Sequence, residues 1–222
     1  MYTLIQVSYY TRGSVSVRTI TVLSQKGGAG KTTLALNLAV AAERAGKSAA
    51  IIDLDPQASA ALWGDAREAG TPAVVSAQAA RLSQILTAAE ENGAELVVID
   101  TAPHSENSAL SAARVSDLCL IPCRPAVLDL RAIGTSIDLV RLAKKDMAVV
   151  LNATPPQGHL ADEAAEVVES YGVPLAPVRL VQRIAYVHAI TAGKAVQEYE
   201  PKGRAANEIA TLYTWICTQL HV

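Results

Sequence analysis

The chain has 222 residues, of which 50% are apolar, and its 19 basic and 21 acidic residues give a formal net charge of −2 at pH 7. This length and apolar share exclude a disordered chain and favour one compact domain. The charge balance excludes a histone-like polycation, although a local basic patch stays open. Three cysteines cannot close a disulfide framework, and the sequence lacks the apolar run of about 18 residues that predicts a transmembrane helix.

The first segment, residues 1–16, lacks the basic start and apolar centre of a signal peptide. It stops directly before a strong strand pattern. We therefore expect an N-terminal extension over residues 1–16, either disordered or non-native, and one domain over residues 17–222. If the extension is non-native, Val17 is the true first residue.

Short apolar or β-branched runs alternate with helical stretches along the rest of the chain. The expected strands are 18–24, 48–53, 73–76, 95–100, 117–122, 147–152 and 173–178. The expected helices include 32–45, 77–91 and 205–220. Apolar strands that alternate with helices are typical of a parallel sheet buried on both faces. We predict an α/β fold with a doubly wound, mostly parallel sheet, helices on both faces and a functional site at the carboxyl ends of the strands.

A glycine-rich loop follows the first expected strand and precedes the first expected helix. It reads Gln-Lys-Gly-Gly-Ala-Gly-Lys-Thr-Thr over residues 25–33. Glycines let backbone N–H groups surround a phosphate chain, and a helix start favours the same anion. We expect Lys31 to reach the β- and γ-phosphates and Thr32 to ligate Mg²⁺. The expected nucleotide contacts of the loop are Gly27, Gly28, Ala29, Gly30, Lys31, Thr32 and Thr33.

This loop departs from the strict phosphate-loop pattern in two ways. Residue 25 is Gln where the pattern has Gly, and a second lysine, Lys26, stands at the start of the loop. The loop resembles the deviant Walker A box of the ParA/MinD family of P-loop ATPases, in particular the small, ParF-like partition type. The resemblance implies that Lys26 crosses a dimer interface and contacts the phosphates of the partner's nucleotide, as an arginine finger does.

Three further segments resemble the same family, and for one of them, residues 121–132, we expect mainly packing and dimer contact. Residues 53–59 resemble its switch I segment, and residues 96–103 resemble its Walker B strand and switch II. The resemblance implies that Asp55 positions the attacking water, that Asp53 lies near the Mg²⁺ site and that Asp100 holds a metal-bound water. The expected catalytic residues are Lys26, Lys31 and Asp55, and the expected metal residues are Thr32, Asp53 and Asp100. Capping of a following helix is the alternative role for Asp55 and for Asp100.

The resemblance also indicates which nucleotide base is bound. In the ParA/MinD family an asparagine at the end of the strand that corresponds to 147–152 contacts adenine, and residues around Pro177 cover the ring. Asn152 and Pro177 are therefore the expected adenine contacts, with a turn-forming role as the alternative for Asn152. The Asn-Lys-x-Asp box that reads guanine is missing here, because Ala-Thr-Pro follows Asn152.

Basic residues gather in two stretches, although the chain as a whole is slightly acidic. Residues 124–145 and residues 179–204 each contain five basic and two acidic residues, which gives each stretch a net charge of +3. The resemblance implies an ATP-state homodimer that binds double-stranded DNA without sequence preference, and a ParB-like partner that stimulates hydrolysis. Solvated helix faces are the alternative. The expected DNA contacts are Arg179, Arg183, Lys194, Lys202 and Arg204.

Two other functions stay open. A MinD-like ATPase binds anionic lipid through a basic amphipathic helix. Residues 212–222 contain no Lys or Arg, so we expect Trp215 and Ile216 to pack against the sheet and expect no stable membrane association. A metabolic or metallocluster enzyme would need a substrate pocket or a second ligand near Cys123, and the sequence identifies neither. We interpret Cys119 and Cys123 as apolar residues of a strand end.

The sequence therefore predicts a cytoplasmic, nucleoid-associated ATPase with ATP and Mg²⁺ as cofactors. By the resemblance, it drives plasmid or chromosome segregation or the positioning of a cargo.

Overall fold

The computed structural model of the chain describes residues 17–222. Within this range six strands form one sheet in the order β3-β2-β4-β1-β5-β6, and every pairing is parallel. The strands are β1 (Arg18–Val22), β2 (Ala49–Asp53), β3 (Ala73–Ser76), β4 (Leu96–Asp100), β5 (Leu118–Cys123) and β6 (Met147–Leu151). The predicted α/β class is confirmed. The predicted extension, residues 1–16, lies outside the described residues.

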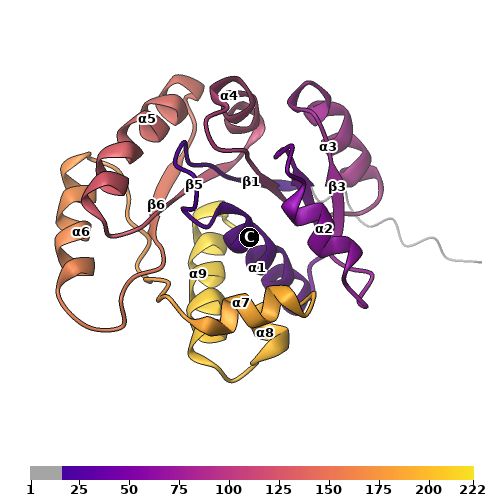
Figure 1. Ribbon diagram of the computed structural model, residues 1–222. Helices are drawn as coiled ribbons and strands as arrows, with labels where there is room; N and C mark the ends of the chain where they lie inside the picture. The colour runs from indigo at the N-terminus through magenta and orange to yellow at the C-terminus, as the bar shows by residue number, and fades with distance from the viewer. Residues whose placement is uncertain (1–16) are drawn as a thin grey trace, which may run out of the picture.

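Helices pack on both faces of the sheet, with α4 and α5 on one side and α1 and α9 on the other (Figure 1). The helices are α1 (Lys31–Arg44), α2 (Ser59–Asp65), α3 (Leu82–Glu91), α4 (Glu106–Val115), α5 (Val127–Ala143), α6 (Leu160–Ser170), α7 (Ile184–Thr191), α8 (Val196–Tyr199) and α9 (Arg204–Leu220), with a 3₁₀ turn η1 (Ala79–Arg81) before α3. The predicted helices 32–45, 77–91 and 205–220 correspond to α1, to η1 with α3, and to α9.

The strands are apolar throughout because both of their faces are covered. In β4, Leu96 and Val98 belong to the core that contains α1 and α9, whereas Val97 and Ile99 point into the core on the other face. α1 packs against both the sheet and α9, and ten of its 14 residues are buried. Small alanine side chains in α1 let its backbone approach the sheet closely, which suits the high alanine content of the chain.

The strand expected over 173–178 is wrong. This segment makes only an isolated bridge between Leu175 and Val149. Val149 donates its N–H to the carbonyl of Pro174 at 2.9 Å, and Ala176 donates to the carbonyl of Val149 at 2.8 Å. Pro174 lies on the same side of the segment as Ala176 but has no N–H group to donate, so the ladder of hydrogen bonds does not extend toward the start of β6. The segment runs beside the sheet as a loop.

The parallel arrangement brings the carboxyl ends of the strands to one edge of the sheet. β1 lies between β4 and β5, and its carboxyl end leads into the glycine-rich loop and α1. In the register of the sheet, Asp100 at the end of β4 pairs with Asp53 of β2 on one side and with Val22 of β1 on the other. The predicted site residues that follow these strands therefore meet at this edge, where the order of the sheet reverses.

Candidate functional site

The glycine-rich loop between β1 and α1 has the backbone shape of a phosphate cradle. Gly28 and Gly30 have φ values of +75° and +89°, which L side chains rarely adopt. A Cβ atom at residue 30 would also collide with the side-chain amide of Asn152. Gly30 is the N-cap of α1 and offers no side-chain hydrogen bond, so the first N–H groups of the helix are free to bind an anion.

The two lysines of this loop occupy different places. Lys31 is buried, at 7% exposure, and its Nζ donates to the carbonyl of Lys26 at 3.4 Å. Burial lowers the pKa of Lys31, and the charges of Asp100 and Asp55 oppose this shift. The Lys26 side chain instead lines a cavity of about 630 Å³ together with His104. The Lys31 side chain therefore lies inside the loop, whereas Lys26 lies on its outer side.

Asp100 closes β4 and is fully buried, at 0% exposure. Neither of its carboxylate oxygens accepts a hydrogen bond within the described residues. Burial raises the pKa of Asp100 to about 7; the Thr32 side chain and the Lys31 charge oppose this rise, although Thr32 does not complete a hydrogen bond. A carboxylate with free oxygens beside a threonine hydroxyl and a phosphate loop fits Mg²⁺, which commonly uses one or two carboxylates together with substrate phosphates.

Asp53 is as deeply buried as Asp100, but its oxygens are occupied. One oxygen accepts the N–H of Asp55 at 2.9 Å, and the other accepts those of Ala60 and Ala61 at 2.9 and 3.1 Å. Ala60 and Ala61 lie in the first turn of α2, so Asp53 caps this helix from seven residues away. The structure thus brings Asp53 to the predicted metal edge with its oxygens directed to backbone donors.

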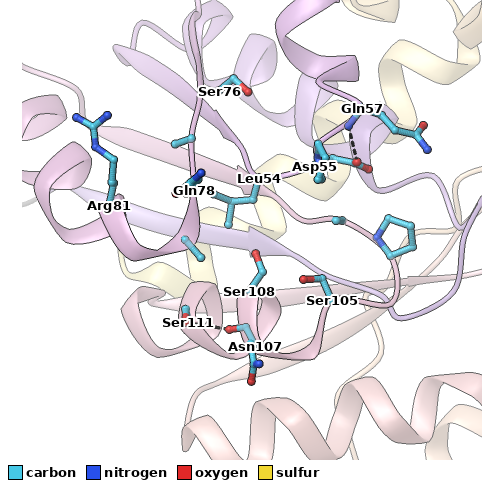
Figure 2. Close-up of a pocket in the computed structure, with 15 residues that line it drawn as sticks. Leu54, Asp55, Gln57, Ser76, Gln78, Arg81, Ser105, Asn107, Ser108 and Ser111 are labelled. Carbon is cyan, nitrogen blue, oxygen red and sulfur yellow. Dashed lines mark hydrogen bonds between the residues drawn. The ribbon is translucent and has the colours of Figure 1, made fainter.

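Asp55 follows β2 and borders an open cavity between the two predicted switch segments. One of its oxygens accepts the N–H of Gln57 at 2.9 Å, which forms a local turn. The cavity has a volume of about 1050 Å³, and Asp55 lies across it from Ser105 and Ser108 at the start of α4 (Figure 2). Ser105 also lines the cavity that contains Lys26, so the two cavities meet at the start of α4.

Strained backbone is concentrated at this edge. Five non-glycine residues in the described part of the chain have positive φ, and two of them, Lys144 and His221, are ordinary helix C-caps. The other three lie in site loops: Ala58 before α2, His104 before α4 and Ala153 directly after Asn152. Such conformations persist only where the surroundings enforce them, and they cluster at functional sites.

Asn152 lies where a base-contacting residue would be expected. Its Nδ2 donates to the carbonyl of Ala29 at 2.7 Å, which joins the end of β6 to the phosphate loop. Asn152 lines a cavity of about 200 Å³ that also contains Arg124 and Tyr186. Pro177 is exposed and does not border this cavity; residues 180–183 form that wall instead. The predicted base contact at Asn152 therefore borders this cavity, whereas Pro177 does not.

Cys119 and Cys123 are core residues of β5, as interpreted from the sequence. Burial raises the pKa of both thiols to about 12, which disfavours the thiolate that a metal would require. No group of three His, Cys, Asp or Glu side chains within residues 17–222 has the arrangement of a metal site. Trp215 and Ile216 pack against the sheet, as expected. None of the helices in this range is long and apolar enough to cross a membrane.

The predicted DNA contacts divide into two groups. Arg179 pairs with Asp162 at 2.6 Å, and Arg183 pairs with Glu208. The hydrogen bond that Arg183 donates to Glu208 raises the pKa of Arg183. Both guanidinium groups therefore hold the protein's own loops in place, and a phosphate would have to compete with a carboxylate for them.

The other three predicted DNA contacts are exposed and, within residues 17–222, unpaired. Lys194, Lys202 and Arg204 are exposed and form no side-chain ion pair or hydrogen bond in the described residues. Arg44, at the end of α1, lies close enough to lower the pKa of Glu198. Sequence reasoning missed Arg44 because it lies far from residues 179–204 along the chain. We call Arg44, Lys194, Lys202 and Arg204 the basic surface.

α8 connects this surface to the phosphate loop. Asn37 of α1 donates to the carbonyl of Thr33 at 2.7 Å and accepts the N–H of Val196 at 2.9 Å. Arg67, which follows α2, is almost fully buried and pairs with Glu198 at 2.8 Å. The helix that carries the phosphate loop and the helix that follows Asp55 are therefore both joined to α8.

Comparisons with known proteins agree with this geometry. Residues 20–196 match the family model of the CobQ/CobB/MinD/ParA nucleotide binding domain. The maintenance of carboxysome distribution protein A of Halothiobacillus neapolitanus is 30% identical over 202 residues, which cover 86% of this chain and 92% of that protein. Its counterpart in Gloeobacter kilaueensis is 31% identical over 208 residues, which cover 91% of this chain and 94% of that protein.

Solved structures share the fold. MinD of Pyrococcus horikoshii, complexed with Mg-ADP, has a TM-score of 0.74 at 18% identity, and the match covers 90% of this chain and 96% of that one. A Cyanothece McdA variant in complex with ATP has a TM-score of 0.72 at 15% identity, and the match covers 93% and 97%. The loop geometry, the buried carboxylate beside it and the family match over most of the chain lead to one conclusion: the chain belongs to the CobQ/CobB/MinD/ParA nucleotide-binding domain family.

Proposed function

We propose that this protein is a ParA-like ATPase that positions a cargo or segregates DNA through a cycle of ATP binding, dimerisation and hydrolysis. The observation that carries the proposal is the Asp100 carboxylate, which is buried without a hydrogen-bond partner among the described residues, beside a phosphate loop that contains two lysines. A fold gains nothing from leaving such a carboxylate unpaired, and a bound nucleotide with its cation would supply the missing partner.

The residues of the loop divide the work of phosphoryl transfer. The free N–H groups at the start of α1 bind the phosphates, and Lys31 places a positive charge inside the loop. Thr32 and Asp100 would hold Mg²⁺, which neutralises charge on the phosphates when it is bound. Asp55 orients the attacking water from the rim of its cavity. Asn152 and the wall formed by residues 180–183 hold the adenine.

Lys26 favours dimerisation of the ATP-bound protein. Its side chain lines a cavity on the outer side of the loop, away from the cavity that contains Asn152. A second copy placed face to face would bring the phosphates of its nucleotide within reach of this lysine, which then acts as an arginine finger does. A homodimer therefore forms in the ATP state, and hydrolysis, stimulated by a ParB-like partner, releases it.

The basic surface gives the dimer a non-specific affinity for double-stranded DNA. Each phosphate contact contributes little, so a monomer binds weakly and a dimer, with twice the contacts, binds far more strongly. The hydrogen bond from α8 to α1 and the ion pair between α8 and Arg67 after α2 connect this surface to the nucleotide site. The names of the two carboxysome-distribution relatives support a protein cargo that is spaced along the nucleoid, and plasmid or chromosome segregation uses the same cycle.

The test is binding of a random-sequence DNA duplex, measured by fluorescence anisotropy with ATPγS, with ADP and without nucleotide, across a salt series. We expect binding only with ATPγS, and a steep loss of affinity as salt rises. Replacement of Lys194, Lys202 and Arg204 by Ala should reduce the slope of log affinity against log salt by roughly 0.9 for every phosphate contact removed. Lys26→Ala should abolish ATPγS-dependent DNA binding because the dimer no longer forms.

Arg179→Ala is the matched control, because this arginine is already paired with Asp162 and should leave the slope unchanged. If the ATPγS dimer forms, as measured by light scattering, but binds no DNA at low salt, the DNA function is rejected. A MinD-like membrane function then becomes the leading alternative, and binding to anionic vesicles tests it.

A further inference from the structure

Arg124 lies over the phosphate loop, although the loop motif does not include it. It directly follows β5, on the opposite side of β1 from Asp100. Its Nη2 atom is 3.7 Å from the position that a Cβ atom would occupy at Gly28. The same side chain borders the cavity that contains Gly30 and Asn152. Arg124 thus lies where the phosphate loop meets the expected base site.

The backbone around Arg124 is fixed, whereas its guanidinium is free. The carbonyl of Cys123 accepts the N–H of Asn152 at 2.8 Å, and the carbonyl of Arg124 accepts the N–H of Ala126 at 2.8 Å. Within residues 17–222 the Arg124 side chain forms no ion pair and no hydrogen bond. Arg179 and Arg183, by contrast, each hold a carboxylate.

We propose that Arg124 is a phosphate-binding residue of the nucleotide site and acts on the nucleotide bound to its own chain. The proposal rests on the proposed ATP-binding function and adds a residue to it. A guanidinium presents a planar set of N–H donors that matches phosphate oxygens two at a time, and it is charged at every physiological pH. With Lys31 inside the loop and Arg124 over its outer rim, the polyphosphate is held from two sides.

Two features favour this assignment over a contact with DNA or with a second copy. The guanidinium already approaches the backbone of the loop in the single chain, so no partner is required to bring it there. Arg124 also shares its cavity with Gly30, Thr33 and Asn152, which all face the expected nucleotide. Residues of the basic surface do not border this cavity.

The test compares ATP, ADP and adenosine binding to the full chain in Mg²⁺ buffer, by calorimetry for ATP and ADP and by displacement of a fluorescent ADP for adenosine. Arg124→Ala should weaken ATP and ADP binding by about tenfold to a hundredfold, as expected for a hydrogen-bonded charged contact. Arg124→Lys should lose less, because it keeps a point charge without the paired donors. Adenosine binding should not change.

Arg131→Ala is the matched control: it removes an exposed arginine of α5 that does not border this cavity, and it should bind all three ligands normally. Unchanged ATP and ADP affinity in Arg124→Ala overturns the proposal. An equal loss for adenosine assigns Arg124 to the base site instead, and a loss for ATP alone, seen only when dimers form, assigns it to the partner's nucleotide. Lys31→Ala distinguishes failure of the Arg124 proposal from failure of the proposed function, because normal ATP binding in that variant would reject the proposed nucleotide site itself.

Discussion

The ends of β2 and β4 lie side by side in the sheet, and each carries a fully buried aspartate, yet the two carboxylates have different surroundings. Asp53 and Asp100 are paired in register, and both are 0% exposed. Within residues 17–222 Asp53 accepts three backbone N–H groups, whereas Asp100 accepts none. The same residue at the same depth therefore caps a helix at one strand end and has unsatisfied oxygens at the next.

The difference separates a structural carboxylate from the proposed ligand of the cation. A carboxylate whose oxygens are filled by backbone donors stabilises the loop around it and has little left to offer a ligand. A carboxylate buried without partners weakens the folded protein, and its pKa rises, here to about 7 for Asp100. Such a cost is retained where a ligand offsets it, so the unsatisfied member of the pair marks the site.

The largest effect on stability is expected at the satisfied carboxylate. Asp53→Ala leaves the N–H groups of Asp55, Ala60 and Ala61 without their acceptor, two of them in the first turn of α2. We expect the free energy of unfolding to fall by about 3–5 kcal/mol, from the loss of a buried cap and its charged hydrogen bonds. Urea denaturation monitored by circular dichroism measures it. Asp53→Asn, which keeps one acceptor oxygen, should lose less.

The opposite sign is expected at Asp100. Between its ordinary pKa of 3.8 and its folded value of about 7, the folded protein holds a proton that the unfolded chain releases. The stability of the nucleotide-free protein should therefore fall as pH rises through this window, and the loss is complete above pH 7. Asp100→Asn cannot release this proton, so at pH 8 it should be more stable than the wild type by about 1–4 kcal/mol.

The same variant provides its own control. At pH 4 the wild-type carboxyl is protonated in the folded protein and about half protonated in the unfolded chain, so the destabilisation is almost absent and the two proteins should unfold at similar urea concentrations. Addition of ATP and Mg²⁺ at pH 8 should stabilise the wild type much more than Asp100→Asn. If Asp100→Asn is less stable than the wild type at pH 8 without ligand, the carboxylate has a partner in solution and the contrast with Asp53 disappears.

Much of the site at the carboxyl edge of the sheet could be predicted from the sequence, because the patterns that indicate it are local. The glycine pattern requires the positive φ values found at Gly28 and Gly30, and apolar strands that end in aspartate indicate buried carboxylates at a sheet edge. The sequence could not separate Asp53 from Asp100. That distinction depends on α2, whose first turn supplies donors to Asp53, while none of the described elements supplies them to Asp100.

Other parts of the site depend on contacts between distant segments. Arg124 reaches the phosphate loop only because β5 lies next to β1, and Arg44 joins the basic surface only because α1 packs against α8. Pro177 lies near the expected base contact in sequence, but the segment from 173 to 178 is not a strand, so the wall of the cavity is formed a few residues later. Periodicity and motifs do not contain this information.

The smallest effect on stability is expected at Asp55, which lies between the two extremes. In the described residues its side chain accepts a single hydrogen bond, from the N–H of Gln57, which closes an exposed turn, and the amide oxygen of Asn can accept this bond equally well. Asp55→Asn should therefore change the free energy of unfolding by less than about 0.5 kcal/mol. ATP turnover, measured by phosphate release, should nevertheless fall at least tenfold, because an amide cannot take a proton from the attacking water. Normal turnover in this variant would move the water-positioning role elsewhere. A large loss of stability would instead place Asp55 with Asp53, among the carboxylates that hold the fold.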